Sequence, residues 1–474
     1  MQIQTHQHLL LAQAWQTLQT EAMQVLAHAN AKVVATCLDN TPAFLALDAA
    51  AQTMGLVHVP LPVFFTSEQM QHALQSAGVD CLIVSAAMAS SWGKGPCTKF
   101  SLLDEDLVCF TLPNAPCVIP KGTSKITFTS GTTAQPKGVC LSLESMLAVA
   151  KSLAEATQPL QLTRHLNALP FAVLLENIAG VLAPAHIGAT LITLPLAQLG
   201  WRGASGFDVA LFHQAVVEFQ PNSLVVLPQM LHAWCAYLQQ TRQTAPECLR
   251  LVAVGGAPVG EALITQAHQL GLPAYEGYGL SEGASVQTLN LPQASRAGSV
   301  GKALPHAEVR VAEDGEIEVR GSLMLGYLGQ EPLNAAWWPT GDLGSVDNEG
   351  YVHIEGRKKN VLITSFGRNV SPEWVETVLR SSPSIREAVV FGNGQPQLSA
   401  VIWPMNAISN ADDVAHAIEV ANAQLPDYAR LAKHVVADVP FTVQSGMSTA
   451  NGRPQRHAIF QTYANTLGLT TPTI

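Results

Sequence analysis

Short apolar runs with the pattern of buried strands alternate with helical patterns through the first two thirds of this chain. The runs occur at residues 33–38, 57–59, 81–84, 189–194, 224–227 and 251–254. Helix signals lie between them, such as Pro42 directly after Thr41, and a capping box formed by Thr66 and Gln69. Strands that alternate with helices are joined by crossovers, which predicts largely parallel sheets with both faces covered.

The pattern changes past Gly298, where short strands and turns replace this alternation. Residues 309–311 and 316–319 alternate between apolar and charged side chains, which is typical of antiparallel strands. We therefore predict an α/β fold whose large amino-terminal domain, residues 1–358, has doubly wound, mostly parallel sheets and a small antiparallel or barrel-like part. The segment 356–376 is rich in Lys, Arg, Gly and Asn, which predicts a hinge. After it, residues 359–474 are predicted to form a smaller, mobile α+β carboxy-terminal domain.

Charge and composition exclude some classes of function. The 474 residues are 48% hydrophobic, enough for a sizeable core, and the net charge of −10 argues against a nucleic-acid partner. The eight cysteines have neither the density of a disulfide scaffold nor the C-x-x-C spacing of zinc sites. The sequence has no signal-peptide pattern and no apolar run long enough for a membrane span. We therefore expect a cytoplasmic protein without a membrane span.

The stretch 126–138 has the composition of an anion-binding loop. A β-branched, apolar strand leads into the loop, and Pro-Lys-Gly closes it before a helix that Ser142 can cap. The loop residues are Thr129, Ser130, Gly131, Thr132 and Thr133. Hydroxyl groups, exposed backbone N–H groups and the Lys137 ammonium can surround phosphate oxygens, although the spacing is not that of a Walker A loop. Taken alone, the stretch could also be an ordinary Ser- and Thr-rich turn.

This loop resembles the phosphate loop of the adenylate-forming superfamily, which includes acyl-CoA synthetases, adenylation domains of peptide synthetases, and luciferases. Those loops usually read Thr-Ser-Gly-Ser/Thr-Thr-Gly-x-Pro-Lys-Gly, and Ala134 stands here where the family has Gly. Further stretches resemble family motifs in the family's order, so the resemblance covers nearly the whole chain. It implies an enzyme that uses ATP and Mg²⁺ to convert a carboxylic acid to acyl-AMP and then passes the acyl group to a thiol.

Two stretches resemble the family's nucleotide-binding motifs. Residues 255–258, Gly-Gly-Ala-Pro, follow a predicted strand at the carboxyl end where open α/β sheets bind ligands. Residues 275–282 resemble the Tyr-Gly-x-Ser/Thr-Glu motif, whose Tyr stacks near adenine, whose hydroxyl touches phosphate and whose Glu coordinates Mg²⁺. Besides the loop and Lys137, the implied nucleotide contacts are Gly255, Gly256, Ala257, Glu276, Gly277, Tyr278, Gly279 and Ser281. The implied metal ligands are Glu282 and Thr129, and structural turns are the alternative.

Three later stretches resemble the ribose, hinge and thiol-channel motifs. In Thr-Gly-Asp at 340–342, the resemblance implies that Asp342 accepts hydrogen bonds from both ribose hydroxyls, as an ionised carboxylate can. Residues 355–360 resemble the Gly-Arg-x-Asp/Lys hinge, which implies a ribose or phosphate contact for Arg357 and a pivot at Lys359. Residues 365–373 resemble the segment that faces the pantetheine channel, with Gly367 allowing close passage of the thiol arm. A surface hairpin is the alternative there.

The apolar segment 169–177 resembles the family's acyl-pocket motif. The implied pocket residues are Phe171, Val173, Leu174 and Glu176. The family commonly has an aromatic residue or His at the place of Val173, so a smaller side chain would leave more apolar room. Glu176 matches members that act on longer acyl chains. The alternative is a plain buried helix with Glu176 at its exposed edge.

The last motif departs from the family. Residues 449–456 resemble a Thr-x-x-Gly-Lys context in which Arg453 occupies the position of the catalytic Lys. A guanidinium supplies charge and forked hydrogen bonds, so we expect Arg453, together with Lys137 and the metal ion that Glu282 holds, to stabilise the charge that develops on phosphate. Arg456 is a nearby substitute for Arg453.

The resemblance thus predicts an AMP-forming acid–thiol ligase for a small-molecule carboxylic acid, apolar and either fatty or aromatic, with coenzyme A as the thiol. A close alternative is a ligase that loads an acyl carrier protein through its phosphopantetheine arm. An alternative from another class is a catalytically inactive, nucleotide-binding regulator or partner subunit, which Ala134 and Arg453 motivate.

Overall fold

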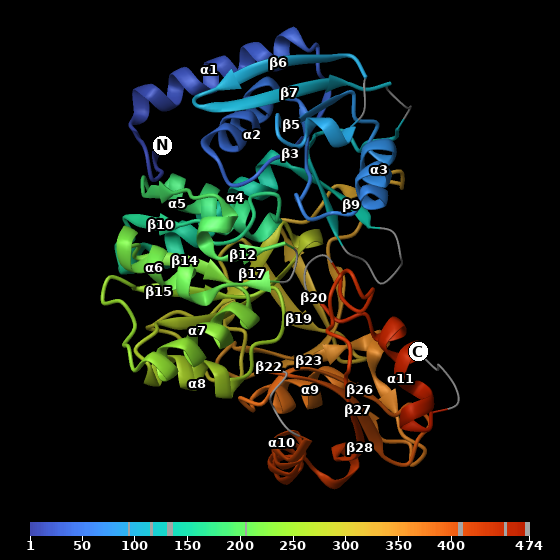
Figure 1. The fold of residues 1–474 in the computed structure, drawn as a ribbon. Coiled ribbons are helices and arrows are strands. Elements are labelled where there is room, and N and C mark those ends of the chain that lie inside the picture. Colours follow the sequence, from blue (N-terminus) through green and yellow to red (C-terminus); the bar gives the residue numbers. More distant parts are fainter. Residues whose placement is uncertain are drawn as a thin grey trace.

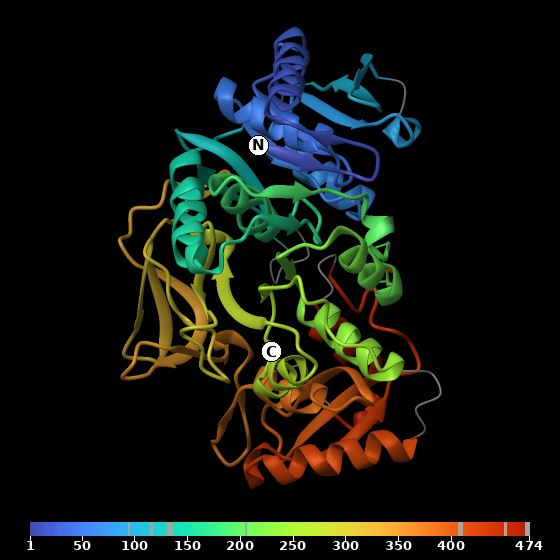
Figure 2. The same cartoon turned by 90° about the vertical axis from the view of Figure 1, so that its left-hand side faces the viewer.

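Two large sheets, a small antiparallel sheet and a carboxy-terminal layer make up the fold (Figure 1). The computed structural model describes residues 1–92, 95–113, 117–129, 136–203, 206–405, 411–449 and 453–469. The blue amino-terminal part lies at the top of both views, and the orange and red carboxy-terminal part lies at the bottom (Figures 1 and 2). In the part of the chain described, no helix is both long and apolar enough to cross a bilayer, and all eight cysteines are free.

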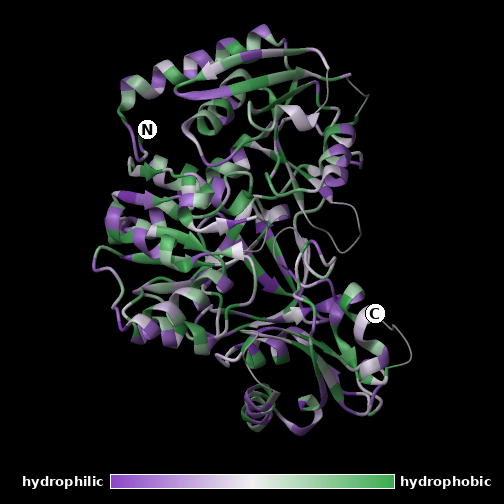
Figure 3. Cartoon of the chain, in the orientation of Figure 1, coloured by the Kyte–Doolittle hydropathy of each residue, from purple (hydrophilic) through white to green (hydrophobic). Residues whose placement is uncertain are grey.

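The first large sheet has eight strands, with parallel pairs in its middle and antiparallel pairs at its edges. In order across the sheet they are β21 (Gly326–Tyr327), β9 (Lys137–Ser142), β8 (Thr123–Thr129), β4 (Val57–Pro60), β3 (Val33–Cys37), β5 (Cys81–Ser85), β7 (Glu105–Thr111) and β6 (Cys97–Leu102). Its helices are α1 (Ala12–His28), α2 (Pro42–Met54) and α3 (Ser67–Ser76). Polar and apolar residues alternate along α1, which buries Trp15 and Leu18 (Figure 3).

The second large sheet has nine strands, and those from β16 to β1 run parallel. In order they are β18 (Lys302–Ala303), β17 (Ser285–Leu289), β16 (Ala274–Leu280), β15 (Leu251–Val254), β14 (Ser223–Val226), β10 (Arg164–Leu166), β11 (Thr190–Ile192), β1 (Gln2–Gln4) and β2 (Leu9–Leu10). The helices on one face are α6 (Val209–Phe219), α7 (Pro228–Thr241) and α8 (Glu261–Gln269). The other face carries α4 (Leu143–Thr157) and a π-helix, Glu176–Leu182, that continues into α5 (Ala183–His186). The prediction of mostly parallel sheets is confirmed.

Local sequence signals fix several helix ends as predicted. Thr41 caps α2 through its side chain, and Gly55 follows the helix with φ = +68°. Thr66 and Gln69 form the predicted capping box at the start of α3. Ser142 caps α4 by accepting a hydrogen bond from a backbone N–H.

The segment after the phosphate loop differs from the prediction. We expected Pro-Lys-Gly to lead directly to the helix that Ser142 caps, but strand β9 comes first and pairs antiparallel with β8. Val139, Cys140 and Leu141 are fully buried, because β9 lies inside the sheet between β8 and β21. The loop residues therefore connect two paired strands.

A four-stranded antiparallel sheet follows, in agreement with the predicted antiparallel part. Its strands, in order, are β19 (Ala307–Val311), β20 (Glu316–Gly321), β22 (Trp338–Val346) and β23 (Val352–Arg357). Before α6 in the chain, β12 (Trp201–Arg202) and β13 (Gly206–Phe207) form a separate antiparallel pair.

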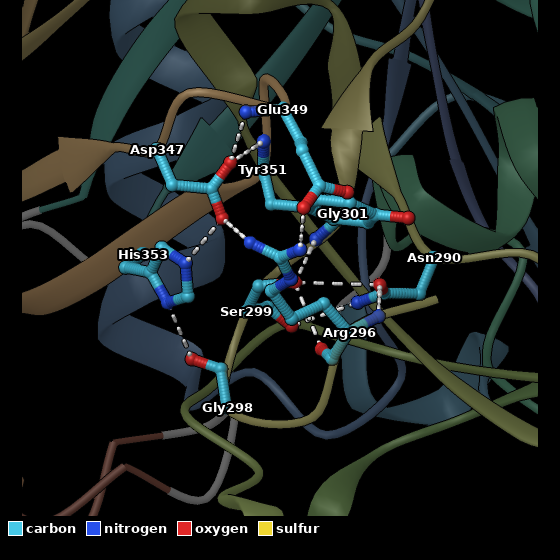
Figure 4. A network of polar contacts seen from close by, with 9 residues as sticks. All are labelled: Asn290, Arg296, Gly298, Ser299, Gly301, Asp347, Glu349, Tyr351 and His353. Carbon is cyan, nitrogen blue, oxygen red and sulfur yellow. Dashed lines mark hydrogen bonds and ion pairs between the residues drawn. The ribbon is translucent and has the colours of Figure 1, made fainter. Parts of the chain in front are cut away.

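A polar network connects this antiparallel sheet to the segment after β17 (Figure 4). Arg296 pairs with Asp347, in the turn between β22 and β23, and donates to the Glu349 carboxylate at 2.6 Å. Asn290 accepts from the Arg296 N–H at 3.0 Å and donates through its own backbone N–H to the Glu276 carbonyl at 2.9 Å. The network thus holds the end of β17 and the backbone of β16 against the antiparallel sheet.

The carboxy-terminal part has its own sheet and core. Its elements are β24 (Leu362–Ile363), β25 (Asn369–Val370), α9 (Pro372–Arg380), β26 (Ile385–Phe391), β27 (Leu398–Pro404), α10 (Ala411–Gln424), β28 (Leu431–Val436) and α11 (Arg456–Leu467). Val390 and Ile402 face α9 and α10, whereas Val389 and Val401 face α11, as the alternation of strand side chains requires. The boundary between the two domains at residues 358 and 359 stays a prediction.

A cluster of charged and polar side chains is buried between α2, β3, β4, β8 and the π-helix. Lys125 Nζ on β8 lies 2.8 Å from Asp48 Oδ1 on α2 and donates to Asn177 Oδ1 on the π-helix at 2.5 Å. His58 Nδ1 on β4 lies 2.6 Å from Asp48 Oδ1, and His58 Nε2 lies 2.8 Å from the Thr36 hydroxyl. We call these five residues the buried charge cluster. It ties the strand that enters the phosphate loop to the π-helix.

Candidate active site

An ion-paired carboxylate, Asp342, forms the centre of the candidate site. Asp342 on β22 lies opposite Arg357 on β23, and its Oδ1 is 2.9 Å from Arg357 Nε. The Tyr278 hydroxyl donates to Asp342 Oδ2 at 2.6 Å. Burial raises the pKa of Asp342, while the Arg357 charge and the Tyr278 hydrogen bond oppose that shift. The structure thus brings together three residues that the sequence assigned to the nucleotide.

The turn before Asp342 is held by the same antiparallel sheet. Gly341 has φ = +76°, which favours glycine, and its N–H donates to Glu316 Oε1 at 2.8 Å. The Thr340 hydroxyl donates to the Ile317 carbonyl at 2.7 Å. The carboxylate of Asp342 is therefore fixed in position by the protein itself.

Strand ends of the nine-stranded sheet form the floor of the site. Gly255, Gly256 and Ala257 follow directly on β15, at its carboxyl end. A Cβ on Gly279 of β16 would lie 1.9 Å from the Ser285 carbonyl oxygen, so only glycine allows β17 to approach there. The close contact between β16 and β17 at Gly279 therefore fixes the position of the last residues of β16.

Glu276 supports the floor of the site. Its buried carboxylate accepts a hydrogen bond from the Val259 N–H at 3.1 Å, and burial raises the pKa of Glu276 to about 7. The contact ties the segment after β15 to β16. Gly277 lies beside Glu276 on β16, and Ser281 begins the short helical turn after that strand.

A second carboxylate, Glu282, is connected to Lys137 through an aromatic ring. The Tyr327 hydroxyl donates to Glu282 Oε1 at 2.7 Å, and Lys137 Nζ lies 5.4 Å from the centroid of the Tyr327 ring. The other Glu282 oxygen has no hydrogen-bond partner among the described residues, so it can bind a hard cation such as Mg²⁺. Within the described ranges, no group of three or more His, Cys, Asp or Glu could hold a metal ion.

The phosphate loop is described only at its two ends. Thr129, the last residue of β8, pairs with Lys137 of β9, and its hydroxyl donates to the Lys137 carbonyl at 3.4 Å. The residues between them that the sequence assigned to phosphate, Ser130, Gly131, Thr132 and Thr133, lie outside the described residues. His72 of α3 supports the far end, with Nε2 3.1 Å from the Pro136 carbonyl oxygen.

The small domain contributes Arg453 to the site. Arg453 Nη2 donates to the Gly256 carbonyl at 2.6 Å, across from the small domain to the large one. Desolvation and the Arg357 charge lower the pKa of Arg453, whereas Asp342 and Glu282 act in the opposite direction. The guanidinium therefore lies within electrostatic reach of both site carboxylates.

Arg456 is not placed to substitute for Arg453. Its Nη2 lies 2.6 Å from Glu376 Oε2 on α9, and its Nη1 donates to the Val390 carbonyl at 3.1 Å. Burial raises the pKa of Glu376 to about 7, and the Arg456 charge opposes that shift. Arg456 therefore stabilises the small domain, and this geometry does not support the rescue role that the sequence suggested.

An anchor on the large domain precedes the predicted pivot. Lys358 Nζ lies 2.6 Å from Asp314 Oδ2 and 2.8 Å from Glu316 Oε2. Glu316 also accepts the hydrogen bond from the Gly341 N–H through its other oxygen. Lys358 is thus tied to the same carboxylate that holds the turn before Asp342.

An anchor on the small domain follows the pivot. Asn360 Nδ2 donates to Glu373 Oε1 on α9. Lys359, between the two anchors, makes no hydrogen bond or ion pair with any described residue, and desolvation and the Arg357 charge lower the pKa of Lys359. A pivot at Lys359 stays a prediction, and it is compatible with this arrangement.

The predicted acyl-pocket residues lie in different environments. Phe171 is fully buried against Phe44, with ring centroids 5.4 Å apart, and Leu174 is buried in the core beside α4. Val173 is half-buried. Leu175, another apolar residue of this segment, lies next to the floor of the site: a Cβ on Gly255 would lie 3.9 Å from Leu175 Cδ2.

Glu176 lies inside the protein. It is 0% exposed, Asn167 Nδ2 donates to its Oε1 at 3.0 Å, and burial raises the pKa of Glu176 to about 8. The alternative of a plain helix with Glu176 at its exposed edge is therefore wrong. The helix here is a π-helix, which the apolar spacing did not indicate.

Gly367 lies in the small domain, in the turn of the β24–β25 hairpin, with φ = +70°. A Cβ there would meet no atom within 4 Å, and the neighbouring Phe366 is 76% exposed. The hairpin turn is open in this arrangement, and the thiol-channel role of Gly367 stays a prediction.

Sequence models of a known family match most of this chain. The model of the AMP-binding enzyme family matches residues 21–328, and the model of the AMP-binding enzyme C-terminal domain matches residues 359–468.

Curated relatives are CoA ligases. The chain is 28% identical over 445 residues to the long-chain-fatty-acid–CoA ligase FadD13 of Mycobacterium tuberculosis (strain ATCC 25618 / H37Rv), covering 87% of this chain and 84% of that protein. It is 30% identical over 352 residues to the indoleacetate–CoA ligase of Aromatoleum aromaticum, covering 69% and 65%. It is 31% identical over 245 residues to the long-chain-fatty-acid–CoA ligase FadD15 of Mycobacterium bovis, covering 46% and 41%. The matched part therefore spans less than two thirds of the length of the latter two relatives.

Solved structures share the fold. The anthranilate CoA ligase AuaEII in complex with anthranoyl-AMP superposes with a TM-score of 0.81 at 18% identity, covering 98% of this chain and 95% of that one. The o-succinylbenzoate CoA synthetase of Bacillus subtilis in complex with its acyl-adenylate gives a TM-score of 0.75 at 22% identity, covering 96% and 94%.

Proposed function

Because this chain belongs to the AMP-binding enzyme family, we propose that it is an AMP-forming acid–thiol ligase. In this proposal, a carboxylic acid reacts with ATP to give acyl-AMP and pyrophosphate, and the acyl group then passes to coenzyme A. The observation that carries the proposal is the contact of Arg453 with Gly256, which brings a small-domain cation within electrostatic reach of Asp342 and Glu282. A cytoplasmic location fits the eight free thiols.

The residues present fit a nucleotide and its metal ion. Asp342, held by Tyr278 and Arg357, would accept hydrogen bonds from the ribose hydroxyls. Glu282 would hold Mg²⁺ together with phosphate oxygens, and Thr129 lies at the edge of the loop that would surround the phosphates. The ion would supply positive charge against the phosphate oxygens when bound.

The charges of the site fit adenylation. Attack of the substrate carboxylate on the α-phosphorus forms the new P–O bond as the bond to pyrophosphate breaks, and negative charge grows on the phosphate oxygens. Two cations are available at the site: Lys137 lies over the Tyr327 ring, and Arg453 donates to the Gly256 carbonyl. Fixed cations lower the barrier because they need little rearrangement as the charge develops.

Pyrophosphate release tests the proposal. Purified protein is incubated with ATP, Mg²⁺ and a panel of aliphatic and aromatic acids, and pyrophosphate is measured with and without each acid. We expect acid-dependent release and acyl-CoA formation when coenzyme A is present. Nucleotide binding without acid-dependent release would favour the inactive regulator, and a thioester formed only on a carrier protein would replace coenzyme A as the acceptor.

Asp342→Ala is expected to weaken ATP binding by about 1.5–3 kcal/mol, the range for hydrogen bonds to a charged group. The variant removes the acceptor that Tyr278 and Arg357 hold in place. Calorimetry with ATP measures the change. Glu308→Ala, an exposed carboxylate of the same antiparallel sheet, is the matched control. Equal affinity in both variants, with intact folds, would remove Asp342 from the site.

Lys359→Pro is expected to slow transfer from acyl-AMP to coenzyme A by roughly tenfold or more, because proline fixes φ near about −65° and hinders the rotation. Adenylation should survive better, since Arg453 already reaches the site in this arrangement. The two half-reactions are measured separately, with Lys358→Pro as a control inside the anchored segment. Equal losses in both half-reactions of Lys359→Pro would contradict a pivot at this residue.

A further inference from the structure

Two cysteine thiols lie in contact near the outer edge of the eight-stranded sheet. Cys81 is the first residue of β5, Cys109 lies near the end of β7, and their Sγ atoms are 3.3 Å apart. This separation is that of a hydrogen bond between two thiols. Among the cysteines that the structure describes, no other two thiols are in hydrogen-bond contact.

The pairing of β5 with β7 places the two thiols on one face of the sheet. The strands are antiparallel neighbours, with Cys81 opposite Thr111 and Ile83 opposite Cys109, so the cysteines are a diagonal pair. The alternation of side chains turns both thiols toward the core that includes residues of α1 and α2. Because a disulfide has its sulfurs about 2.05 Å apart, the two Sγ atoms would need to approach by about 1.3 Å.

The diagonal placement favours a reversible bond over a permanent one. Diagonal neighbours in an antiparallel pair are about 7–8 Å apart at Cα, which is at or just beyond the upper limit for an unstrained disulfide. A bond between Cys81 and Cys109 would therefore pull the two strands slightly together. Strained disulfides are the ones that thiols reduce most easily.

The two thiols differ in reactivity. Cys109 keeps 6% of its surface exposed, whereas Cys81 keeps 1%. The hydrogen bond from the Cys81 thiol lowers the pKa of Cys109, although burial and the Asp80 charge act against this shift. The same hydrogen bond, together with burial, raises the pKa of Cys81. Because the thiolate is the reactive form, Cys109 is the better nucleophile of the pair.

The other cysteines lack this combination. Cys37, Cys140 and Cys235 are fully buried, and burial raises the pKa of each to about 12. Cys97 is exposed on β6, but it lies one position along from the residue that faces Cys109. The alternation of side chains therefore turns Cys97 to the opposite face of the sheet.

We propose that Cys81 and Cys109 are a modification site, at which a hydroperoxide such as hydrogen peroxide converts the two thiols to a reversible disulfide. The Cys109 thiolate attacks the O–O bond of the peroxide and becomes a sulfenic acid, and the hydroxide that leaves takes up a proton to give water. The Cys81 sulfur then attacks the Cys109 sulfur, the S–S bond forms, and the sulfenic hydroxyl leaves as a second water with the Cys81 proton. The two thiols lose two electrons, and the peroxide gains them. The inference does not depend on the proposed function.

The bond would fasten the outer hairpin to the rest of the sheet. β6 and β7 form the outer edge of the eight-stranded sheet, and β7 joins it through β5 (Figure 1). A covalent link across this pair prevents β7 from separating from β5 at that end. Strands β8 and β9, which flank the phosphate loop, lie beyond β3 and β4 in the sheet. The modification therefore acts on local opening of the hairpin.

Peptide mapping tests the bond. The native protein is treated with hydrogen peroxide, catalase stops the reaction, the remaining thiols are alkylated in urea, and the unreduced digest is analysed by mass spectrometry. We expect a linked peptide that contains Cys81 and Cys109 and that dithiothreitol separates. Both thiols found alkylated, at a peroxide concentration that oxidises the exposed Cys97, would overturn the proposal. Cys109 found as a sulfinic acid beside a free Cys81 would overturn it as well.

Serine variants test the order of attack. Cys81→Ser keeps a hydroxyl donor beside Cys109 but removes the second sulfur, so dimedone should label Cys109 as a sulfenic acid. Cys109→Ser should leave Cys81 unlabelled. Cys37→Ser, which removes a buried thiol from β3 of the same sheet, is the matched control and should form the disulfide as wild type does.

Rates in the wild-type protein give a measurement that needs no variant. We expect the free thiol of Cys109 to disappear at least about tenfold faster than that of Cys37, because a lowered pKa increases the thiolate fraction. Circular dichroism checks the fold of each variant. Dimedone on Cys81 in Cys109→Ser, or equal rates for Cys109 and Cys37, would contradict the assignment of Cys109 as the attacking thiol.

Hydrogen exchange measures the effect on the hairpin. Amide exchange in peptides from β6 and β7 should be slower in the oxidised protein than in the reduced one, because local opening of the hairpin precedes exchange. The strands β14 and β15 of the other sheet should not change. Cys109→Ser treated with the same peroxide should exchange like the reduced protein. Equal exchange of the hairpin with and without the disulfide would show that the bond does not fasten it.

Discussion

Replacing Arg453 by alanine is expected to slow acyl-AMP formation by about 10² to 10³, the usual effect of removing one preorganised donor from a developing charge. Arg453 is a small-domain cation that reaches Gly256, and Asp342 and Glu282 act on its charge. Transfer from supplied acyl-AMP to coenzyme A should change little, because the predicted thiol face of the small domain does not use Arg453. Pyrophosphate exchange and single-turnover thioester formation measure the two steps separately.

The controls for Arg453 follow from its surroundings. Arg453→Lys keeps the charge but loses the forked geometry, so we expect a partial loss of the adenylation rate. Arg456→Ala should instead lower stability, because Arg456 pairs with the buried carboxylate Glu376. Wild-type exchange rates in Arg453→Ala, in a protein that clearly adenylates its acid, would defeat the assigned role.

Replacing Lys125 by methionine is expected to lower the free energy of unfolding by about 3–5 kcal/mol, the cost of removing one partner from a buried ion pair. Asp48 would keep only His58 and the Asn177 amide as partners, in a place where neither Asp48 nor Lys125 is exposed to water. A loss of this size is a large fraction of the total stability of about 5–15 kcal/mol of a typical domain. Urea denaturation of the variant and of wild type measures it.

An exposed ion pair supplies the comparison for Lys125. Lys151 lies 3.7 Å from Glu155 on the surface of α4, so Lys151→Met should cost less than about 1 kcal/mol. Exchanging Asp48 and Lys125 together for apolar residues should cost less than Lys125→Met alone, since no uncompensated carboxylate remains. Similar values for Lys125→Met and Lys151→Met would show that the buried charge cluster does not stabilise the fold.

The sequence predicted those features that depend on local chemistry. The caps at Thr41, Thr66 and Ser142 need only a few neighbouring residues, and the structure has them. Thr-Gly-Asp at 340–342 and Gly-Arg at 356–357 also meet as the motif order implied. The parallel sheets followed from the alternation of strand and helix. This pattern extends over many residues, so an error at any single position does not change the prediction.

Features that depend on contacts between distant segments were missed. The composition of the phosphate loop did not indicate that a strand, β9, follows it and pairs with β8. The contact of Tyr327 with Glu282 likewise depends on the pairing of β21 with β9. The buried charge cluster left a weak signal: His58 and Asp48 each interrupt an apolar run, and Lys125 directly precedes Ile126. Which of these charges meet could not be decided without knowing how the three elements that carry them, α2, β4 and β8, pack together.

The two anchors beside Lys359 have a consequence for the order of events in time. Lys358 is fastened to the large domain and Asn360 to the small one, so a rotation at the single residue between them would turn the small domain as a rigid body. Arg453 and the open hairpin around Gly367 belong to that one body, so bringing either to the floor of the site would remove the other. We therefore expect the thiol of coenzyme A to reach the site only after the Arg453 guanidinium has left it. The thiol would then be absent until formation of acyl-AMP is complete. Glu316 binds both Lys358 and the turn beside Asp342. A change at Asp342 on departure of the nucleotide would therefore act, through Glu316, on Lys358 next to the axis of the rotation.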